Sequence, residues 1–304
     1  MASRVLRWIG LSQAHEFQAH EPSNGGEMGA RVHQWWVIYR IALEERLVYR
    51  GDFALGTLMR FLPIVTQIFL WWAVFDAMRH ESADASQTIA GYSYANFIAY
   101  YLLTMLGRAF SSMPGLASGI AQQIRNGEVK KFLIQPVDLI GFLLLNRVAH
   151  KSAYYSVALG PFALVYFLCQ SYFPPMPGVG TWGAFGLSLI LAFVLGFFLE
   201  ASIGLIAFWF LEVSSLLFVY MLLSFFLSGH MFPLDMLPQP WSTIVDFLPL
   251  KYLAYFPAAV FLGKVSGREL VISLWVEVFW VVALMILCRV MWNRGLARYS
   301  GYGG

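Results

Sequence analysis

The sequence predicts an all-α membrane protein with six transmembrane helices, and three observations support this fold class. Hydrophobic residues make up 59% of the 304 residues and charged residues only 12%, about half the charged share of a typical soluble domain. Long apolar stretches recur along the chain. Lysine and arginine gather in alternate connecting segments. Polar groups are too few to cover a water-soluble globule of this length, so lipid must cover part of the surface.

Several stretches of the chain are long and apolar enough to span a membrane. A bilayer core of roughly 30 Å requires about 20 mostly apolar helical residues. Six stretches qualify: 53–75, 95–113, 149–169, 182–200, 209–228 and 270–291. The fourth and fifth come from one apolar run, Trp182 to Leu227, which only Glu200 and Glu212 interrupt. We expect this run to fold as a helical hairpin with both acids near its inner turn.

The basic residues orient these spans. Six arginines precede the first span, five basic residues separate the second span from the third, and three lie at the C-terminal end. Only four basic residues fall on the other side. Since cytoplasmic segments carry the excess of lysine and arginine, both termini are expected in the cytoplasm of a multi-pass protein of the cell (inner) membrane.

The chain before the first span divides into two parts. Residues 15–28 are polar, with Gly, Asn and Glu among them, and we expect residues 1–31 to form a disordered tail. Residues 32–50 mix aromatics with arginines, which suits a helix lying in the cytoplasmic interface. An amphipathic helix packed on protein is the alternative. Residues 32–304 are expected to form a single membrane domain.

The segment 115–146 is the longest inner connection. Leu116, Ile120 and Ile124 repeat every four residues and predict a helix with one apolar face. Asn126-Gly127 can end this helix, and Pro136 stops a second short element over 128–135. A charged helix–turn–helix below the membrane is a plausible docking surface for a cytoplasmic partner.

The outer segment 229–264 combines five prolines with many Phe, Leu, Tyr and Trp residues. The prolines forbid one continuous span, while the apolar content forbids a fully solvated loop. We therefore expect an outer re-entrant helical hairpin between spans five and six. Non-helical backbone at that depth requires cover by protein or by a water-filled cavity.

These two segments carry a resemblance to a known family. The run from Ile124 to Pro136, IRNGEVKKFLIQP, and the run from Ser228 to Pro238, SGHMFPLDMLP, followed by LPLKY up to Tyr252, resemble the corresponding segments of type-2 ABC exporter permeases. The resemblance implies a compact bacterial permease subunit without a fused ATPase. It would pair with a second permease, as homodimer or heterodimer, and with cytoplasmic ABC ATPase subunits among membrane lipids.

The resemblance also implies site residues. The ATPase-coupling segment would comprise Arg125, Asn126, Gly127, Glu128, Lys130, Lys131 and Pro136. The outer gate or cap would comprise Phe232, Pro233, Pro238, Pro249, Lys251 and Tyr252. The implied function is ATP-driven export of a hydrophobic or amphipathic substrate.

The chemistry of the chain agrees with a subunit that is not itself an enzyme. No G-x-x-x-x-G-K-[ST] loop occurs in the sequence, so ATP and Mg²⁺ are expected on a partner ATPase, and no cofactor, metal or nucleic acid on this chain. A secondary transporter or channel not driven by ATP is the alternative. An intramembrane enzyme is disfavoured, because His150 and His230 are expected on opposite sides of the membrane.

Two features within the spans stay open. Glu277 is a possible intramembrane charge, which either pairs with a cation such as Arg268 or contacts substrate. Small residues follow one another at four-residue steps on the fourth span (Ser188, Ala192, Gly196 and Gly204). They predict a close helix contact, either within the subunit or with a second permease.

Overall fold

The computed structural model describes residues 24–47, 50–81, 88–135, 137–210 and 212–299. Helices dominate these residues, and the described part contains no strand beyond an isolated bridge between Ile89 and Tyr92. The all-α prediction is confirmed. Pro136 and residues 1–23 lie outside the described residues.

Helices occupy all six predicted span positions: α3 (Arg50–Glu81), α4 (Tyr94–Ser111), α7 (Leu139–Leu168), α8 (Val179–Leu205), α9 (Ser214–Leu227) and α12 (Gly267–Arg298). Three helices of the described chain are long and apolar enough to cross a membrane, over Leu55–His80, Val179–Phe208 and Gly267–Arg298. The α9 helix has 14 residues and reaches only about 21 Å at 1.5 Å per residue. The count of six spans therefore stays a prediction.

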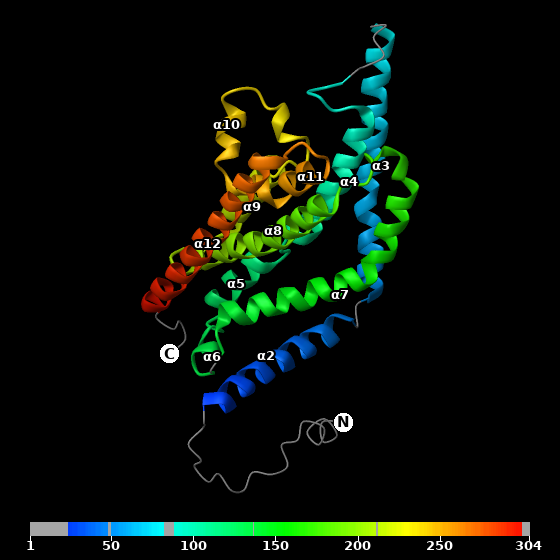
Figure 1. Ribbon diagram of the computed structural model, residues 1–304. Coiled ribbons are helices and arrows are strands. Elements are labelled where there is room, and N and C mark those ends of the chain that lie inside the picture. The colour runs from blue at the N-terminus through cyan, green and yellow to red at the C-terminus, as the bar shows by residue number, and fades with distance from the viewer. Residues whose placement is uncertain (1–23, 48–49, 82–87, 136, 211, 300–304) are drawn as a thin grey trace.

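Two groups of helices make up the molecule (Figure 1). In the first, α2 (Asn24–Leu47) and α3 pack along α7. Pro161 lies inside α7, and the helix turns from its course beside α2 to run alongside α3, as expected where a proline removes a backbone hydrogen bond. In the second group, α8 is central and packs against α4, α5, α11 and α12.

The helix α2 begins at Asn24, earlier than the expected start at Val32, although Gly25, Gly26 and Gly29 are unfavourable in a helix. It ends at Leu47, and α3 begins at Arg50. Trp36 and Ile41 of α2 stay exposed, as an interfacial helix requires. The interfacial position itself stays a prediction.

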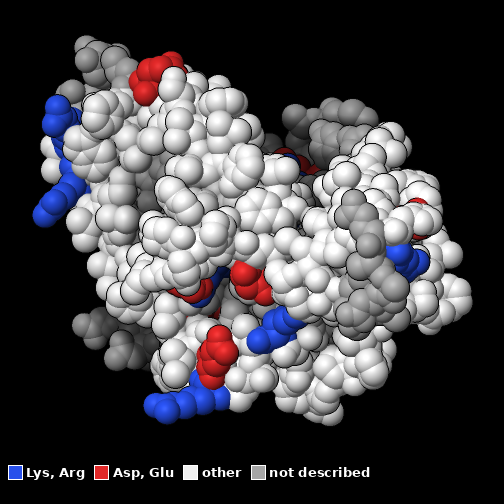
Figure 2. Space-filling view, turned by 90° about the horizontal axis from the view of Figure 1, so that it is seen from above, with Lys and Arg blue, Asp and Glu red and all other residues white. Residues whose placement is uncertain are grey.

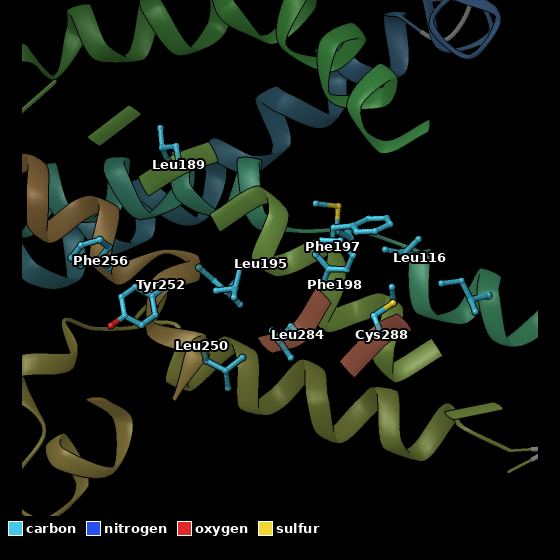
Figure 3. Close-up of a cluster of buried hydrophobic side chains, with 14 of the residues drawn as sticks. Leu116, Leu189, Leu195, Phe197, Phe198, Leu250, Tyr252, Phe256, Leu284 and Cys288 are labelled. Carbon is cyan, nitrogen blue, oxygen red and sulfur yellow. The ribbon is translucent and has the colours of Figure 1, made fainter. Parts of the chain in front are cut away.

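The core of the second group forms around α8. Leu195, Phe197 and Phe198 of α8 pack with Leu116 of α5 (Leu116–Arg125) and with Leu284 and Cys288 of α12. Figure 3 shows this cluster, which also includes Leu250, Tyr252 and Phe256 of the outer segment. Apolar side chains from four elements thus meet on one helix, which fixes its position relative to the segments on either side.

The small residues of α8 lie inside this contact. A Cβ added at Gly196 would approach the carbonyl oxygen of Ser111 in α4 to under 3.0 Å, and one at Gly204 would lie 2.8 Å from the carbonyl oxygen of Ala117 in α5. The predicted close contact is confirmed. It is formed within the subunit, with α4 and α5.

The outer segment forms short helices separated by irregular turns: η3 (Leu234–Met236), α10 (Trp241–Asp246), η4 (Pro249–Leu253) and α11 (Tyr255–Phe261). All six residues Phe256–Phe261 are buried, while α10 keeps Trp241 and Ile244 exposed. Figure 2 shows that charged side chains are sparse on the face seen from above. The prolines break the segment as predicted, and its re-entrant depth stays a prediction.

Candidate functional site

The predicted coupling segment forms a charged turn between two helices. The helix α5 ends at Arg125, Gly127 follows with φ of +73°, and α6 spans Lys130–Leu133. The predicted end of the first helix at Asn126-Gly127 is confirmed. A positive φ favours glycine, which explains why the chain can reverse here within so few residues.

Buried apolar side chains anchor the turn to the protein, and its polar side chains are exposed. Val129 is fully buried and Phe132 is 9% exposed. The charged side chains of Arg125, Glu128, Lys130 and Lys131 and the amide of Asn126 are all exposed. Two apolar side chains beside them, Leu133 and Ile134, are 52% and 84% exposed. A charged rim next to exposed apolar groups is the composition expected of a protein-binding surface.

Hydrogen bonds hold the charges of the turn in place. Lys131 Nζ lies 3.1 Å from Glu128 Oε2, and the Asn126 amide donates to Glu128 Oε1 at 3.4 Å. These two donors, of which Lys131 has the larger effect, lower the pKa of the Glu128 carboxyl below its usual value. The acid therefore stays ionised and its exposed oxygens remain a fixed negative point on the surface.

The turn is connected to two helices of the membrane domain. The helix α5 packs against α8 and against η2 (Ile206–Phe208) that follows it. Arg125 Nη1 lies 3.8 Å from Glu212 Oε2, and Glu212 accepts a hydrogen bond from the N–H of Ser214 at the start of α9. A displacement of the turn would therefore act on both α8 and α9.

A polar cavity of about 220 Å³ lies among α4, α5, α8 and α9. Its lining includes Arg108 and Ser111 of α4, Glu200 of α8, and Tyr220 and Ser224 of α9. Glu200 accepts a hydrogen bond from the N–H of Met113 at 3.2 Å. Glu200 thus lies beside the cavity, within α8 and five residues before its end at Leu205.

A second cavity, of about 260 Å³, shares α4 and α9 with the first and is also lined by α3 and by the start of the outer segment. Arg108 lines both cavities, and the second also includes Gln67 of α3, Tyr101 of α4, Phe225 of α9 and His230. Burial, with a further contribution from Arg108, lowers the pKa of His230 to about 4. We call the two cavities together the polar path. Between α4 and α9 it contains the neutral imidazole of His230 and the guanidinium of Arg108.

Tyrosines of α4 attach the outer segment to this path. The Tyr101 hydroxyl donates to the Met231 carbonyl at 2.7 Å, and the Tyr100 hydroxyl donates to the carbonyls of Gly229 and Phe232. Tyr92 donates to Asp235 at 3.2 Å. These tyrosines were not predicted from the sequence. The feature that could have indicated them is the density of Tyr at the start of an otherwise apolar helix.

The structure does not bring all the predicted cap residues together. Phe232 and Pro233 lie beside α4, while Pro238 is exposed before α10. Pro249 begins η4, which also holds Lys251 and the buried Tyr252. Lys251 Nζ lies 2.8 Å from Asp246 of α10. The predicted cap is therefore two separate contacts, one on α4 and one between α10 and η4.

Glu277 lies on the buried side of α12, on the stripe that continues through Leu284 and Cys288. It is fully buried, and neither carboxylate oxygen has a hydrogen-bond partner within the described residues. No ion pair to Arg268 occurs in that part of the chain. The expected pairing with Arg268 is therefore wrong, because the two residues lie more than two helical turns apart on α12.

Comparison with known proteins agrees with this arrangement. No curated protein matches the chain. A family model described as ABC-2 family transporter protein matches residues 61–303, which include the coupling turn, both polar cavities and the outer segment. The chain belongs to this family and is a membrane permease component of an ABC transporter.

Proposed function

We propose that this permease exports a hydrophobic or amphipathic substrate and is driven by a separate cytoplasmic ABC ATPase that binds the turn between α5 and α6. One observation carries the proposal. The exposed charges of the turn are joined, through α5 packing and the Arg125–Glu212 contact, to the helices that line the polar cavities. A partner bound to the turn could therefore change the shape of the polar path.

In this mechanism the chain performs no covalent chemistry. ATP-driven closure of the ATPases shifts the balance between two conformations. Movement of α5 would carry the end of α8 and the start of α9 with it, which changes the width of the space around Arg108 and Glu200. Substrate would enter this space in one state and leave toward the outer segment in the other.

The surroundings of the path support an amphipathic substrate. Charged and hydroxyl groups line its centre. Large apolar side chains are exposed along α3 and α9, including Leu62, Phe69 and Phe218. A polar head could lie against Arg108 while an apolar tail stays on these faces. A second permease subunit, a copy of this chain or a related one, would cover the same faces.

The test measures partner binding and ATP hydrolysis together. The tagged full chain is purified from its native membranes in mild detergent, and the amount of copurified ABC ATPase and its Mg²⁺-dependent ATP hydrolysis are measured. We expect Lys131→Glu to reduce both by at least tenfold, because it reverses a charge on the turn. Arg40→Glu on α2 is the matched control, since Arg40 also lies in an exposed ion pair, 2.9 Å from Glu44.

Equal ATPase recovery with both variants would exclude the turn as the docking site. Thermal stability should not separate the two variants, because exposed ion pairs contribute only about 0–1 kcal/mol. A loss of stability confined to Lys131→Glu would mean that any change in binding reflects misfolding.

One observation favours the alternative, a secondary transporter. Buried acids without partners occur in transporters that couple to protons, and Glu277 is such an acid. Transport that continues without ATP, that requires a proton gradient, and that stops in Glu277→Gln would support this alternative.

A further inference from the structure

An apolar cavity of about 280 Å³ lies between α7 and α8. Its floor consists of α4 and α11 residues, including Leu102, Leu103 and Phe261, each at most 8% exposed. Its rim consists of Leu159 of α7, 69% exposed, and Trp182 of α8, 43% exposed. The cavity thus opens at the surface and ends deep in the helix bundle.

The helix packing explains why the space exists. The helix α7 packs against α2 and α3, whereas α8 packs against α4, α5, α11 and α12. Among the described residues, no packing of similar extent joins α7 to α8. Leu159, Ala163 and Tyr166 of α7 all line the cavity, and their spacing places them on one helical face. One face of α7 is therefore turned toward α8 without touching it closely.

Aromatic contacts join the rim of the cavity to its floor. The ring of Phe261 contacts Trp182 at 5.1 Å and Phe185 at 5.2 Å between centroids, both edge-to-face, and Phe173 at 6.1 Å. Such pairs are favourable beyond their buried area. Four aromatic rings from α8, α11 and the segment after α7 thus form one side wall, from Trp182 at the rim to Phe261 at the floor.

The lining determines what can fill this space. Its side chains are apolar apart from the hydroxyl of Tyr166, which bonds Met176 Sδ at 3.9 Å, and the indole of Trp182. Water needs two to four polar partners to remain in a cavity. An apolar ligand needs none. An engineered apolar cavity of roughly 150 Å³ in another protein stays dry and binds benzene, so a space of about 280 Å³ is large enough for part of a hydrocarbon chain.

The rim identifies the source of that hydrocarbon. The chain belongs to a family of membrane transporters, and the rim is continuous with exposed apolar residues of α7 and α8 such as Leu164, Phe167 and Leu187. In a membrane these residues face acyl chains. The cavity is therefore a recess in a lipid-covered surface, beside α11.

We infer that the cavity between α7 and α8 is a binding site for one acyl chain of a bilayer phospholipid, which enters past Leu159 and Trp182 and reaches Leu103 of α4. The bound chain fills the space between the two groups of helices. The inference rests on the membrane location of the family and is independent of the export direction and of the ATPase partner.

The experiment uses the full chain in nanodiscs that contain phosphatidylcholine with a diazirine in one acyl chain. After photolysis, lipid adducts are located by mass spectrometry. We expect adducts on Leu102, Leu103 and Met105 of α4, which line the cavity and are each at most 8% exposed. Adducts on Leu62 and Phe69 of α3, which are 64% and 65% exposed, report the ordinary lipid contact.

Ala163→Trp should fill the cavity from the α7 wall and lower the α4 adducts at least tenfold, with the α3 adducts unchanged. Leu164→Trp is the matched control, because Leu164 is 56% exposed and does not line the cavity. Leu159→Trp provides a second obstruction from an exposed rim position, in case Ala163→Trp fails to fold.

Two outcomes would overturn the inference: no adducts on α4, or α4 adducts that persist in both obstructed variants. A second readout is thermal stability. Added phosphatidylcholine should raise the melting temperature of the unmodified chain and of Leu164→Trp, and should raise that of Ala163→Trp clearly less.

Discussion

Replacement of Gly196 by alanine tests the close contact between α8 and α4. The added Cβ would lie under 3.0 Å from the carbonyl oxygen of Ser111. This oxygen belongs to the backbone, so relief requires a shift of one whole helix. Overpacking of this kind costs about 1–3 kcal/mol, while alanine is favoured over glycine inside a helix by about 1 kcal/mol. We expect a net loss of up to about 2 kcal/mol.

Gly186→Ala is the matched control on the same helix. A Cβ at Gly186 meets no atom within 4 Å, so only the helix preference acts, and a small gain in stability follows. The difference between the two variants is thus about 1–3 kcal/mol, since the propensity contribution is common to both.

The assay is thermal unfolding of the purified protein in detergent, followed by the amount that remains monodisperse after heating. Gly196→Ala should lose its folded fraction at a clearly lower temperature than Gly186→Ala. Equal melting temperatures would refute the close packing of α8 on α4. Gly204→Ala, whose Cβ would lie 2.8 Å from the Ala117 carbonyl, should behave like Gly196→Ala.

Three further predictions concern single side chains. His230 has a pKa of about 4 in the folded protein, against an ordinary value of 6.5. The unfolded chain therefore binds the proton more readily, and the stability of the fold should decrease as the pH drops from 6.5 toward 4. His230→Phe should remove this part of the pH dependence of the melting temperature. Glu277→Leu should raise the melting temperature, because a buried polar group without a partner costs about 1–3 kcal/mol; a lower melting temperature than that of Glu277→Gln would contradict the described packing. Asp138 accepts from the N–H of Gly141 at 2.7 Å and pairs with Arg289 at 2.6 Å. Asp138→Ala should therefore destabilise the protein more than Arg289→Gln, by the roughly 0.5–2 kcal/mol of a helix cap, and equal melting temperatures would exclude a capping role.

Local signals in the sequence predicted much of the fold. The four-residue repeat of Leu116, Ile120 and Ile124 predicted α5, and Asn126-Gly127 predicted its end. The prolines of the outer segment predicted its short helices. These features depend on residues close together in the chain, through helix periodicity, backbone conformation and the missing N–H of proline.

The candidate site was only partly predictable. The charged turn could be found from the sequence, because its residues are consecutive. The cavities lined by Arg108 could not, because they combine α3, α4, α5, α8 and α9. Glu200 was expected near the inner turn, and only the tertiary structure shows that it lies within α8 beside a cavity.

The sequence by itself thus determined that this is a helical membrane protein and that one face of α8 makes a close contact. It also determined where helices end within the inner and outer connecting segments. Only the tertiary structure decided that α4 and α5 form this contact, that α7 stands apart from α8, and that Glu277 faces inward. The physical reason is the solvent. In water an apolar face must point inward, but in a bilayer lipid and protein are both apolar, so hydropathy cannot distinguish a buried face from a lipid-facing one. Shape and close packing make that choice.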